Sequence, residues 1–495
     1  MKPRPNNAIT IHSRWLFHNK ESTAFVETAM TTTTTNPALE GNFAPVREEI
    51  TADNLKILGE LPPELSGMFV RNGPNPQFSP IGNYHWFDGD GMLHGVLLNN
   101  GKAQYRNRYV QTRGFLIEKA ADKAVWSGLL EPPQMDNPYG PSKNTANTAL
   151  VWHAGQFLAL WEGGEPHAIK VPELETVGAY TFNGKLVSPV TAHPKVDPIT
   201  GEMMFFGYSI VQPPYLQYTV VSDAGELLRT VRIDLPEPVM MHDFAITEHY
   251  TIFMDLPLTF SVTRMQQGQP LLMFEQDKPS RFGIVPRHGD NSNIRWFECP
   301  ACFVTHTLNA YEDGDEVVLL GCRTSATTLG LSESPDILDA DIPRLHRWRF
   351  NLNTGRVSEE RLDEVSSEFP RVNEQLLGRK TRYGYTAKLA PGQLLPKFEG
   401  LIKYDLSTGQ SQTLRFGSHQ YGGEAVFVPR PGAVAEDEGW LLTFVHNEES
   451  DTSELLVVDA QDITAGAVAR VIIPQRVPYG FHAAWISEEQ LAVGR

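Results

Sequence analysis

Four of the 15 histidines in this 495-residue chain share one local context. His193 and His306 each precede a turn and a strand-like run, with a glycine eight residues on, and His242 and His482 lead through acidic residues into similar runs. Any one of them alone would more often be a surface or core residue. In a radially repeated fold, however, equivalent positions converge, and four imidazoles at one point form a metal site. All-nitrogen ligation suits Fe(II), Zn(II) or Cu(II) without choosing among them.

Three glutamates lie in apolar or turn settings where a buried carboxylate is expected. Glu162 follows an apolar run, Glu368 precedes a Phe-Pro pair, and Glu424 follows two glycines and precedes another apolar run. Histidine ligands usually donate their second N–H to a carboxylate, so each glutamate is a candidate partner. A solvated carboxylate at a sheet edge is the alternative for each of them.

The elements that would position these residues are short strands. Apolar runs of four to eight residues alternate with turns of the form Asp/Asn-x-x-x-Gly, which predicts antiparallel hairpins in series. A long all-β chain must protect its sheet edges, and a β-propeller does so more economically than one oversized sandwich. The exception is residues 115–126, whose apolar spacing predicts one amphipathic helix. The clearest strands are predicted at 203–208, 250–255, 316–320, 440–445 and 454–459.

Composition excludes several classes of function. With 42 basic and 59 acidic side chains the net charge is −17, which disfavours binding to nucleic acid. No apolar run approaches the roughly 20 residues of a membrane-spanning helix. The first 45 residues lack the pattern of a secretory signal, and three cysteines fit a reducing compartment, so a cytoplasmic location is expected. We expect a disordered extension at 1–45, within which Met30 could be the true start, and one domain at 46–495.

Longer motifs surround the candidate residues. They are Arg71-Asn-Gly-Pro-Asn-Pro76, Trp86-Phe-Asp-Gly-Asp-Gly-Met92, Asn144-Thr-Ala-Asn-Thr-Ala-Leu150, Thr191-Ala-His193-Pro194, Met241-His-Asp-Phe244, His306-Thr-Leu-Asn309, Glu368-Phe-Pro-Arg371 and Tyr479-Gly-Phe-His482. Together these motifs closely resemble those of the carotenoid cleavage oxygenases from about residue 46 onward, and most of all the plant-type enzymes that cut carotenoids at the 9,10 and 9′,10′ double bonds.

This resemblance implies a seven-bladed β-propeller with one Fe(II) on its axis, under a dome of loops and helix. His193, His242, His306 and His482 match the family's iron ligands, and Glu162, Glu368 and Glu424 match the glutamates that orient three of them. The fourth ligand, His193, would have no such partner. Thr148 matches a threonine beside the open iron position. The implied reaction adds O₂ across one double bond of a polyene and gives two carbonyl products.

Two other functions remain open. Stilbene-cleaving members of the same superfamily carry a lysine immediately before the glutamate that matches Glu162, whereas this chain has Trp161, which favours an apolar substrate in a tunnel. A propeller that binds a partner or an apocarotenoid without turnover is the third hypothesis, but it would have no use for four metal-binding histidines. The segment 115–135 could contact a membrane peripherally, or the helix could pack in the core. No obligate protein partner is inferred.

Overall fold

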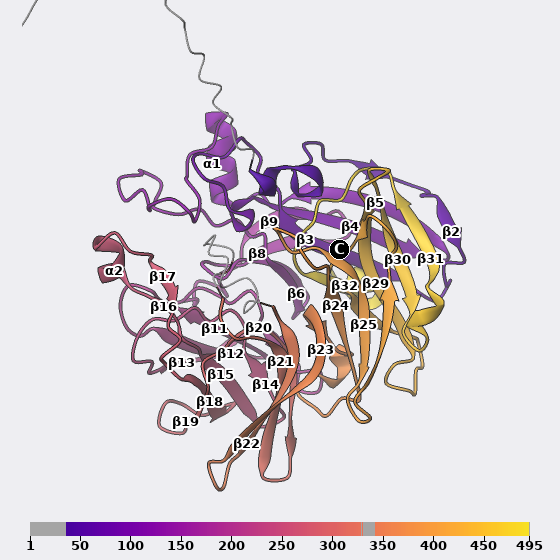
Figure 1. The fold of residues 1–495 in the computed structure, drawn as a ribbon. Coiled ribbons are helices and arrows are strands. Elements are labelled where there is room, and N and C mark those ends of the chain that lie inside the picture. The colour runs from indigo at the N-terminus through magenta and orange to yellow at the C-terminus, as the bar shows by residue number, and fades with distance from the viewer. Residues whose placement is uncertain (1–35, 328, 330–341, 495) are drawn as a thin grey trace, which may run out of the picture. The chain divides into compact units, whose positions relative to one another are not determined.

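The computed structural model describes residues 36–327, 329 and 342–494. Residues 36–495 form one compact unit, in which strands paired in antiparallel ladders dominate (Figure 1). The expected all-β class is therefore confirmed. Residues 1–29 and Met30 lie outside the described part of the chain. Residues 36–45, assigned above to the extension, form the 3₁₀ turns η1 (Pro37–Leu39) and η2 (Gly41–Phe43), and Phe43 is buried against Trp86 and Tyr479.

The first sheet joins the two ends of the compact unit. Its order is β1-β5-β4-β3-β32, so the last strand of the chain pairs with β3 from near its beginning. Its strands are β1 (Thr51–Ala52), β3 (Gly67–Pro74), β4 (Gly91–Asn99), β5 (Lys102–Tyr109) and β32 (Ala483–Ser487).

Three four-stranded sheets follow in chain order, with a two-stranded sheet inserted in the third. The first has β6 (Ala149–His153), β7 (Gln156–Leu160), β8 (His167–Lys170) and β9 (Glu175–Ala179). The second has β10 (Lys195–Val196), β11 (Met203–Tyr208), β12 (Leu216–Val221) and β13 (Leu227–Ile233). The third has β14 (Ala245–Ile246), β15 (Tyr250–Asp255), β18 (Ser280–Pro286) and β19 (Arg295–Cys299), and the insert has β16 (Leu258–Phe260) and β17 (Leu272–Phe274).

The next sheet has seven strands because one strand serves two units. The start of β23 pairs with β22, and its end pairs with β24. Its strands are β20 (Phe303–Asp313), β21 (Glu316–Thr324), β22 (Arg344–Asn351), β23 (Val357–Arg371), β24 (Tyr383–Leu389), β25 (Phe398–Asp405) and β26 (Gln410–Arg415). The last sheet has β2 (Ile57–Gly59), β27 (Gln420–Tyr421), β28 (Val426–Pro429), β29 (Gly439–Asn447), β30 (Thr452–Asp459) and β31 (Ala467–Ile473).

The predicted turns form for the expected reason. The side chains of Asp197, Asn351 and Asp405 each accept hydrogen bonds from the backbone N–H groups two and three residues on. The glycine that closes each turn has a positive φ, as at Gly201 with 72° and Gly409 with 71°. The five strands predicted most clearly are all present, with ends that differ by at most a few residues.

The core lies between sheets that follow one another in the chain. In β11, Met203 and Phe205 pack against the β6–β9 sheet, while Met204 and Phe206 pack against the β14–β19 sheet. A strand that is buried on both faces reads as a continuous apolar run, which explains the sequence of β11. Similar clusters join each further pair of neighbouring units, and one joins the β27–β31 sheet back to the first sheet.

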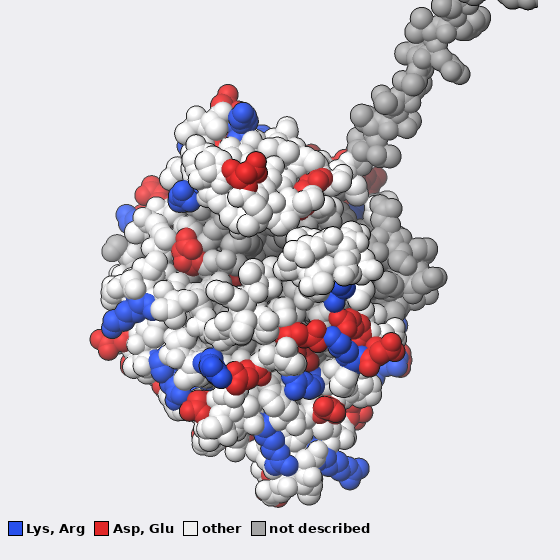
Figure 2. Space-filling model, turned by 90° about the vertical axis from the view of Figure 1, so that its left-hand side faces the viewer, with Lys and Arg blue, Asp and Glu red and all other residues white. Residues whose placement is uncertain are grey.

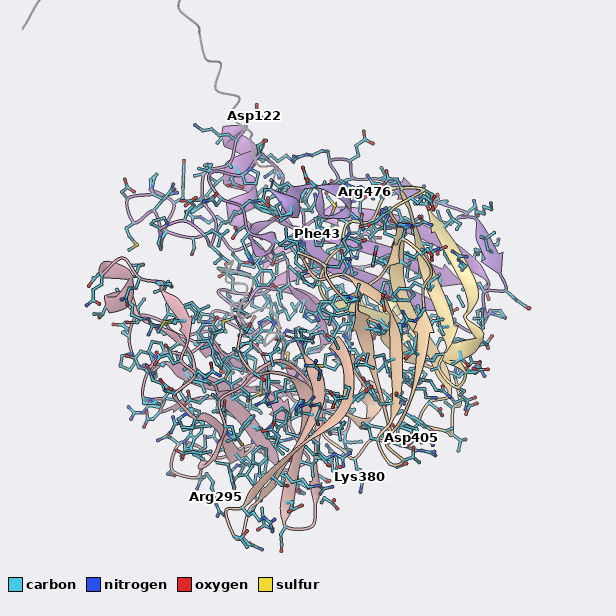
Figure 3. All side chains as sticks on the ribbon, viewed as in Figure 1. Phe43, Asp122, Arg295, Lys380, Asp405 and Arg476 are labelled. Atoms are coloured by element: carbon cyan, nitrogen blue, oxygen red, sulfur yellow. The ribbon has the colours of Figure 1, made fainter. Side chains whose placement is uncertain are left out.

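The predicted helix is present but shorter than expected. Helix α1 (Arg113–Ala121) begins at its N-cap Thr112 and ends where Asp122 turns left-handed with φ 54°, at the tip labelled in Figure 3. The other described α-helices are α2 (Val262–Gln266) and α4 (Glu488–Val493), and the remaining 3₁₀ turns are η3 (Trp86–Asp88), η4 (Glu374–Leu376) and η5 (Ile463–Ala465). No helix in the described residues has the length and apolar character needed to cross a bilayer.

The apolar residues of this helix are only partly buried. The side chain of Leu116 is 48% exposed, whereas the buried residues of α1 include Phe115 and the acidic Glu118. Glu118 accepts hydrogen bonds from Lys143 and from the backbone N–H of Val125 at 2.7 and 2.9 Å. This buried ion pair turns the side chain of Glu118 inward, while that of Leu116 faces outward.

Candidate metal centre

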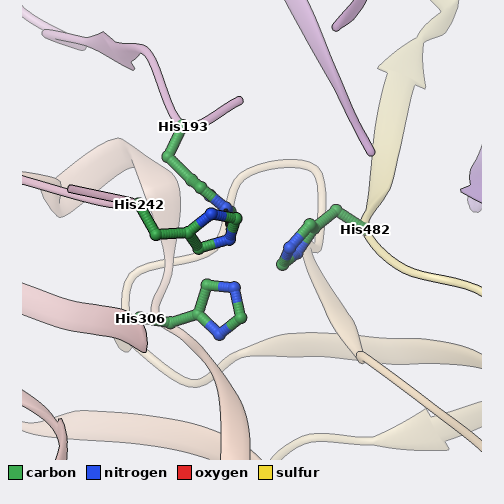
Figure 4. Close-up of side chains that lie close together, drawn as sticks. All are labelled: His193, His242, His306 and His482. Atoms are coloured by element: carbon green, nitrogen blue, oxygen red, sulfur yellow. Dashed lines mark hydrogen bonds between the residues drawn. The ribbon is translucent and has the colours of Figure 1, made fainter. Parts of the chain in front are cut away.

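The structure brings the four predicted histidines together. One ring nitrogen from each of His193, His242, His306 and His482 lies within 4.8 Å of the others, and the four rings face a common point (Figure 4). The Nε2 atoms of His193 and His242 are 3.0 Å apart. His306 and His482 are buried, and the other two are half-buried.

Each histidine stands at an edge strand of a different sheet. His193 comes just before β10, His242 before β14 and His482 before β32. His306 lies inside its strand, as the fourth residue of β20. The four histidines therefore occupy corresponding places in their sheets.

The remaining units carry other candidate residues at the corresponding place. Thr148 immediately precedes β6, Glu368 lies in the part of β23 that begins a new unit, and Glu424 lies between β27 and β28. Only Glu162 departs from the pattern, because it follows β7 instead of a first strand.

The three glutamates contact His242, His306 and His482, the three ligands other than His193. The Nδ1 atom of His242 lies 2.6 Å from Glu162, that of His306 lies 2.5 Å from Glu368, and that of His482 lies 2.9 Å from Glu424. A carboxylate on Nδ1 fixes the tautomer and leaves Nε2 with a lone pair for a metal ion.

Among the residues that the structure describes, His193 has no carboxylate on its ring. Its backbone N–H donates to the hydroxyl of Thr191 at 3.2 Å, and that hydroxyl donates to the carbonyl of His242 at 3.2 Å. The main chain near His193 is thus tied to the neighbouring ligand segment, in agreement with the expectation that this ligand has no orienting glutamate.

The surroundings shift the pKa values of these groups in different directions. Burial, followed by the neighbouring imidazoles, lowers the pKa of His193 well below its usual range. Burial also acts to lower the pKa of His242, but the Glu162 carboxylate outweighs it, so the pKa of His242 is raised. Burial opposes ionisation of Glu424, yet Arg371 and then His482 outweigh it and lower the pKa of Glu424 to about 2. This glutamate is therefore an anion throughout the physiological range.

The charged side chains around the cluster leave a negative excess. The three glutamates and Asp243 supply four carboxylates, whereas Lys195 and Arg371 supply two cations. Arg371 also contacts Glu374, which is mostly exposed and therefore solvated. Buried charge is costly unless it is compensated, and a divalent cation among four neutral imidazoles would bring the sum to zero.

One orphaned atom supports the same conclusion. The Nε2 atom of His306 is buried and has no hydrogen-bond partner in the described part of the chain. Such atoms are rare in folded proteins unless a ligand uses them. The donor set therefore fits a borderline divalent metal ion such as Fe(II).

Thr148 lies beside this cluster and is held by a residue that the sequence argument did not single out. Its carbonyl accepts a hydrogen bond from the N–H of His482 at 3.2 Å, and its hydroxyl donates to Oδ1 of Asn147 at 2.9 Å. The amide nitrogen of the buried Asn147 donates to the carbonyls of Phe87 and Gly89, each at 2.7 Å, which fixes the orientation of that amide. The only feature of the sequence that pointed to Asn147 was its place within the motif 144–150.

Arg371 was likewise quoted in a motif without being given a role. Its guanidinium donates to Glu424 at 2.9 Å and to the carbonyl of Ala483 at 3.1 Å, so it ties the glutamate to the segment that carries His482. Trp161 is half-buried directly before Glu162, and its ring covers Gly163, where a Cβ would come within 2.5 Å of the ring. Glycine at 163 is thus required for this placement of the indole.

Comparisons with known proteins identify the family. A family model described as "RPE65: Retinal pigment epithelial membrane protein" matches residues 43–487. The chain belongs to this family of carotenoid cleavage oxygenases.

Relatives in the family cover nearly the whole chain. The carotenoid 9,10(9′,10′)-cleavage dioxygenase 1 of Pisum sativum is 42% identical over 99% of this chain and 96% of its own length. The enzyme of the same name from Arabidopsis thaliana is 43% identical over 92% of this chain and 90% of its own length.

Solved structures of family members superpose closely. The lignostilbene dioxygenase of Pseudomonas brassicacearum is 33% identical, with a TM-score of 0.85 over 91% of this chain and 98% of that one. The cobalt-substituted ACO of Synechocystis is 30% identical, with a TM-score of 0.80 over 90% of this chain and 97% of that one.

Proposed function

We propose that this chain is a non-haem Fe(II) dioxygenase that cleaves a carbon–carbon double bond of a carotenoid or apocarotenoid with O₂ and releases aldehyde or ketone products. The bond cut is the 9,10 bond, the 9′,10′ bond or both. The observation that carries the proposal is the identity of 42–43% over at least 92% of the chain to enzymes named for that cleavage, together with the four-histidine cluster.

In this proposal the four histidines are the metal ligands, and Glu162, Glu368 and Glu424 hold three of them in the ligating tautomer. The bound iron supplies activation of O₂. The chain's own residues hold the imidazoles in place: the three glutamates accept from their Nδ1 atoms and leave Nε2 for the metal. Thr148, whose hydroxyl proton is engaged by Asn147, offers only its methyl group or a lone pair to the open position, and so limits what approaches it.

The proposed architecture is a seven-bladed β-propeller with the metal on its axis. It is supported by the four-stranded units that follow one another along the chain, by the core clusters between successive units, and by the cluster that joins the last unit to the first. The pairing of β32 with β3 would close the ring. Such closure leaves no long sheet edge exposed to solvent.

Substrate choice follows from the residue before Glu162. An indole at Trp161 offers apolar surface and no cation for a phenolate, which favours a polyene over a hydroxylated stilbene. Because a polyene presents many similar double bonds, the walls of an apolar tunnel would select the bond by holding it beside the metal.

A direct assay tests this function. The purified chain, loaded with Fe(II), is incubated with β-carotene and separately with a hydroxylated stilbene, and the products are identified by mass. We expect two carbonyl fragments from cleavage at a 9,10 bond and little turnover of the stilbene. Faster turnover of the stilbene than of any carotenoid would favour the lignostilbene-type activity, and binding of carotenoid without products would favour a non-catalytic scaffold.

We further propose that the chain works in the cytoplasm and contacts a membrane peripherally through residues 115–135. The support is the row of apolar side chains that face outward there, with Leu129 60% and Met135 80% exposed. In Figure 2, charged side chains are sparser on the middle of the face that carries α2 and the loop after α1 than on its lower part. A carotenoid dissolved in the bilayer could enter from such a contact. Co-sedimentation of the chain with neutral lipid vesicles tests it.

A further inference from the structure

A fourth carboxylate beside the cluster, that of Asp243, joins three of the histidine segments. Asp243 directly follows His242 and is 1% exposed. Its Oδ1 lies 2.7 Å from Nζ of Lys195 and accepts from the N–H of Phe244 at 2.7 Å. Its Oδ2 accepts from both the N–H and the hydroxyl of Thr307, at 2.7 and 2.8 Å. The acceptor capacity of this carboxylate is therefore fully used.

The partners of Asp243 belong to the other ligand segments. Lys195 is two residues after His193, at the start of β10, and Thr307 is one residue after His306, in β20. The three elements come from three different sheets and share no backbone ladder. The carboxylate of Asp243 is thus a common attachment point for them.

This attachment matters most for His193, whose ring has no carboxylate partner among the described residues. Pro194 lies between His193 and Lys195 and fixes its own φ near −65°, which removes freedom from the link. The Nζ atom of Lys195 also lies 5.8 Å from the ring centre of Phe244, and its side chain is largely buried. A displacement of Lys195 would therefore move His193.

We propose that Asp243 is a positioning residue, which sets the mutual placement of His193, His242 and His306, and that Lys195 transmits this placement to His193. The glutamates orient the other three ligands by contacting their rings, whereas Asp243 orients His193 through the main chain that links it to Lys195. The inference rests on the proposed function, in that the cluster is taken to hold a divalent metal.

Asparagine cannot replace Asp243 in this arrangement. It offers one carbonyl oxygen and one NH₂ group, while Lys195 and Thr307 both present donors. Whichever way the amide turns, one of the two ligand segments meets an N–H instead of an acceptor. The change is nearly isosteric, so it tests the hydrogen bonds and the charge without opening a cavity.

The experiment titrates Co(II), as a visible probe of ligand geometry, into the metal-free full-length chain and its variants. We expect Asp243→Asn to weaken Co(II) binding by about 10- to 100-fold and to shift the Co(II) absorption bands, because His193 no longer approaches correctly. Asp437→Asn is the matched control, since Asp437 forms a buried pair with Lys403 at 2.6 Å and contacts none of the histidine segments. We expect it to leave Co(II) affinity and spectrum within twofold of the unaltered chain.

A double variant separates positioning from stability. In Asp243→Asn the Lys195 ammonium loses its anion, so Asp243→Asn with Lys195→Met should recover thermal stability without recovering Co(II) affinity. If the single variant does not fold, Lys195→Met alone carries the same test, with about a tenfold loss of affinity and a shifted spectrum expected. Lys195→Arg should preserve both the Co(II) affinity and the Co(II) spectrum.

Two results overturn the inference. Unchanged Co(II) affinity and spectrum in Asp243→Asn would show that the carboxylate does not position the ligands, as would recovery of affinity in step with stability in the double variant. Both leave the proposed function intact. Failure of the unaltered chain to bind Co(II) would instead overturn the proposed function, and this inference with it.

Discussion

The candidate metal centre and the α1 region, defined as residues 113–139, satisfy their polar groups in opposite ways. At the centre, histidines from four sheets turn inward and most of the carboxylates beside them are paired. In the α1 region the charged Glu118 is buried with Lys143 and Asp90, and apolar side chains such as Leu116 turn outward. Burial of polar groups thus builds a binding site in one place and frees an apolar surface in the other.

The difference shows which kind of group each region depends on. Removing a partner at the centre should lower metal affinity, because the remaining ligands lose their tautomer and aim. Removing a partner in the α1 region should lower local stability and leave the metal unaffected.

The largest effect is expected from removing a ligand. His306→Ala deletes one of four ligands and leaves Glu368 without its imidazole partner, so metal affinity should fall by more than about 100-fold and cleavage should cease. Metal content after gel filtration and product formation measure this. His346→Ala is the control, because His346 is equally buried in β22 of the same sheet but lies outside the cluster. Retention of metal by His306→Ala would remove this residue from the centre.

The two buried glutamates with different partners offer a finer comparison. Glu368→Gln and Glu424→Gln should each weaken metal binding by about 10- to 100-fold. Only Glu424→Gln leaves a buried cation, Arg371, without its buried anion, so it should also cost about 3–5 kcal/mol of unfolding free energy. Chemical denaturation of the metal-free variants measures that second effect. Equal losses of unfolding free energy in the two variants would mean that the ion pair between Arg371 and Glu424 does not stabilise the fold.

Local sequence predicted the centre because its residues recur at one structural position. Each histidine stands before or within an edge strand of its sheet. The turns at Asp197 and its equivalents show where the chain reverses direction between strands. The contributions of Asp243 and Asn147 could not be read in this way. Their partners, Thr307 and Phe87, are about 60 residues distant in the chain, and no local pattern encodes such a contact.

The burial of the α1 region could not be predicted, for a related reason. Helical spacing of apolar residues indicates which side chains share a face, but it does not say which face is covered. Here Lys143 and Asp90, from outside the helix, bury Glu118 and so decide the orientation. The apolar spacing therefore predicted the helix but left open which of its faces is covered.

The variant Glu118→Gln tests that explanation. Glu118→Gln keeps an acceptor for Val125 but removes the negative charge beside Lys143, so the chain should lose about 1–3 kcal/mol of unfolding free energy. Metal affinity should be unchanged, because no ligand or ligand partner is touched. Denaturation and Co(II) titration of the same sample give both numbers. A parallel loss of metal affinity would contradict the independence of the two regions and show that they are coupled.

The smallest effect is expected from the outward-facing side chains themselves. Leu129→Ser with Met135→Ser removes two residues that are 60% and 80% exposed, so unfolding free energy should change by no more than about 0.5 kcal/mol. If this surface enters a bilayer, each side chain contributes roughly 1 kcal/mol of transfer free energy, and vesicle binding should fall by about tenfold or more. Ile199→Ser is the control, since Ile199 is 73% exposed in the 197–201 turn outside this region.

Cleavage assays add a second comparison. Cleavage of a detergent-dispersed carotenoid should stay unchanged in the double variant and in the control, whereas cleavage of a vesicle-embedded carotenoid should slow only in the double variant. Equal vesicle binding by the double variant and the control would show that the outward apolar face does not contact the membrane.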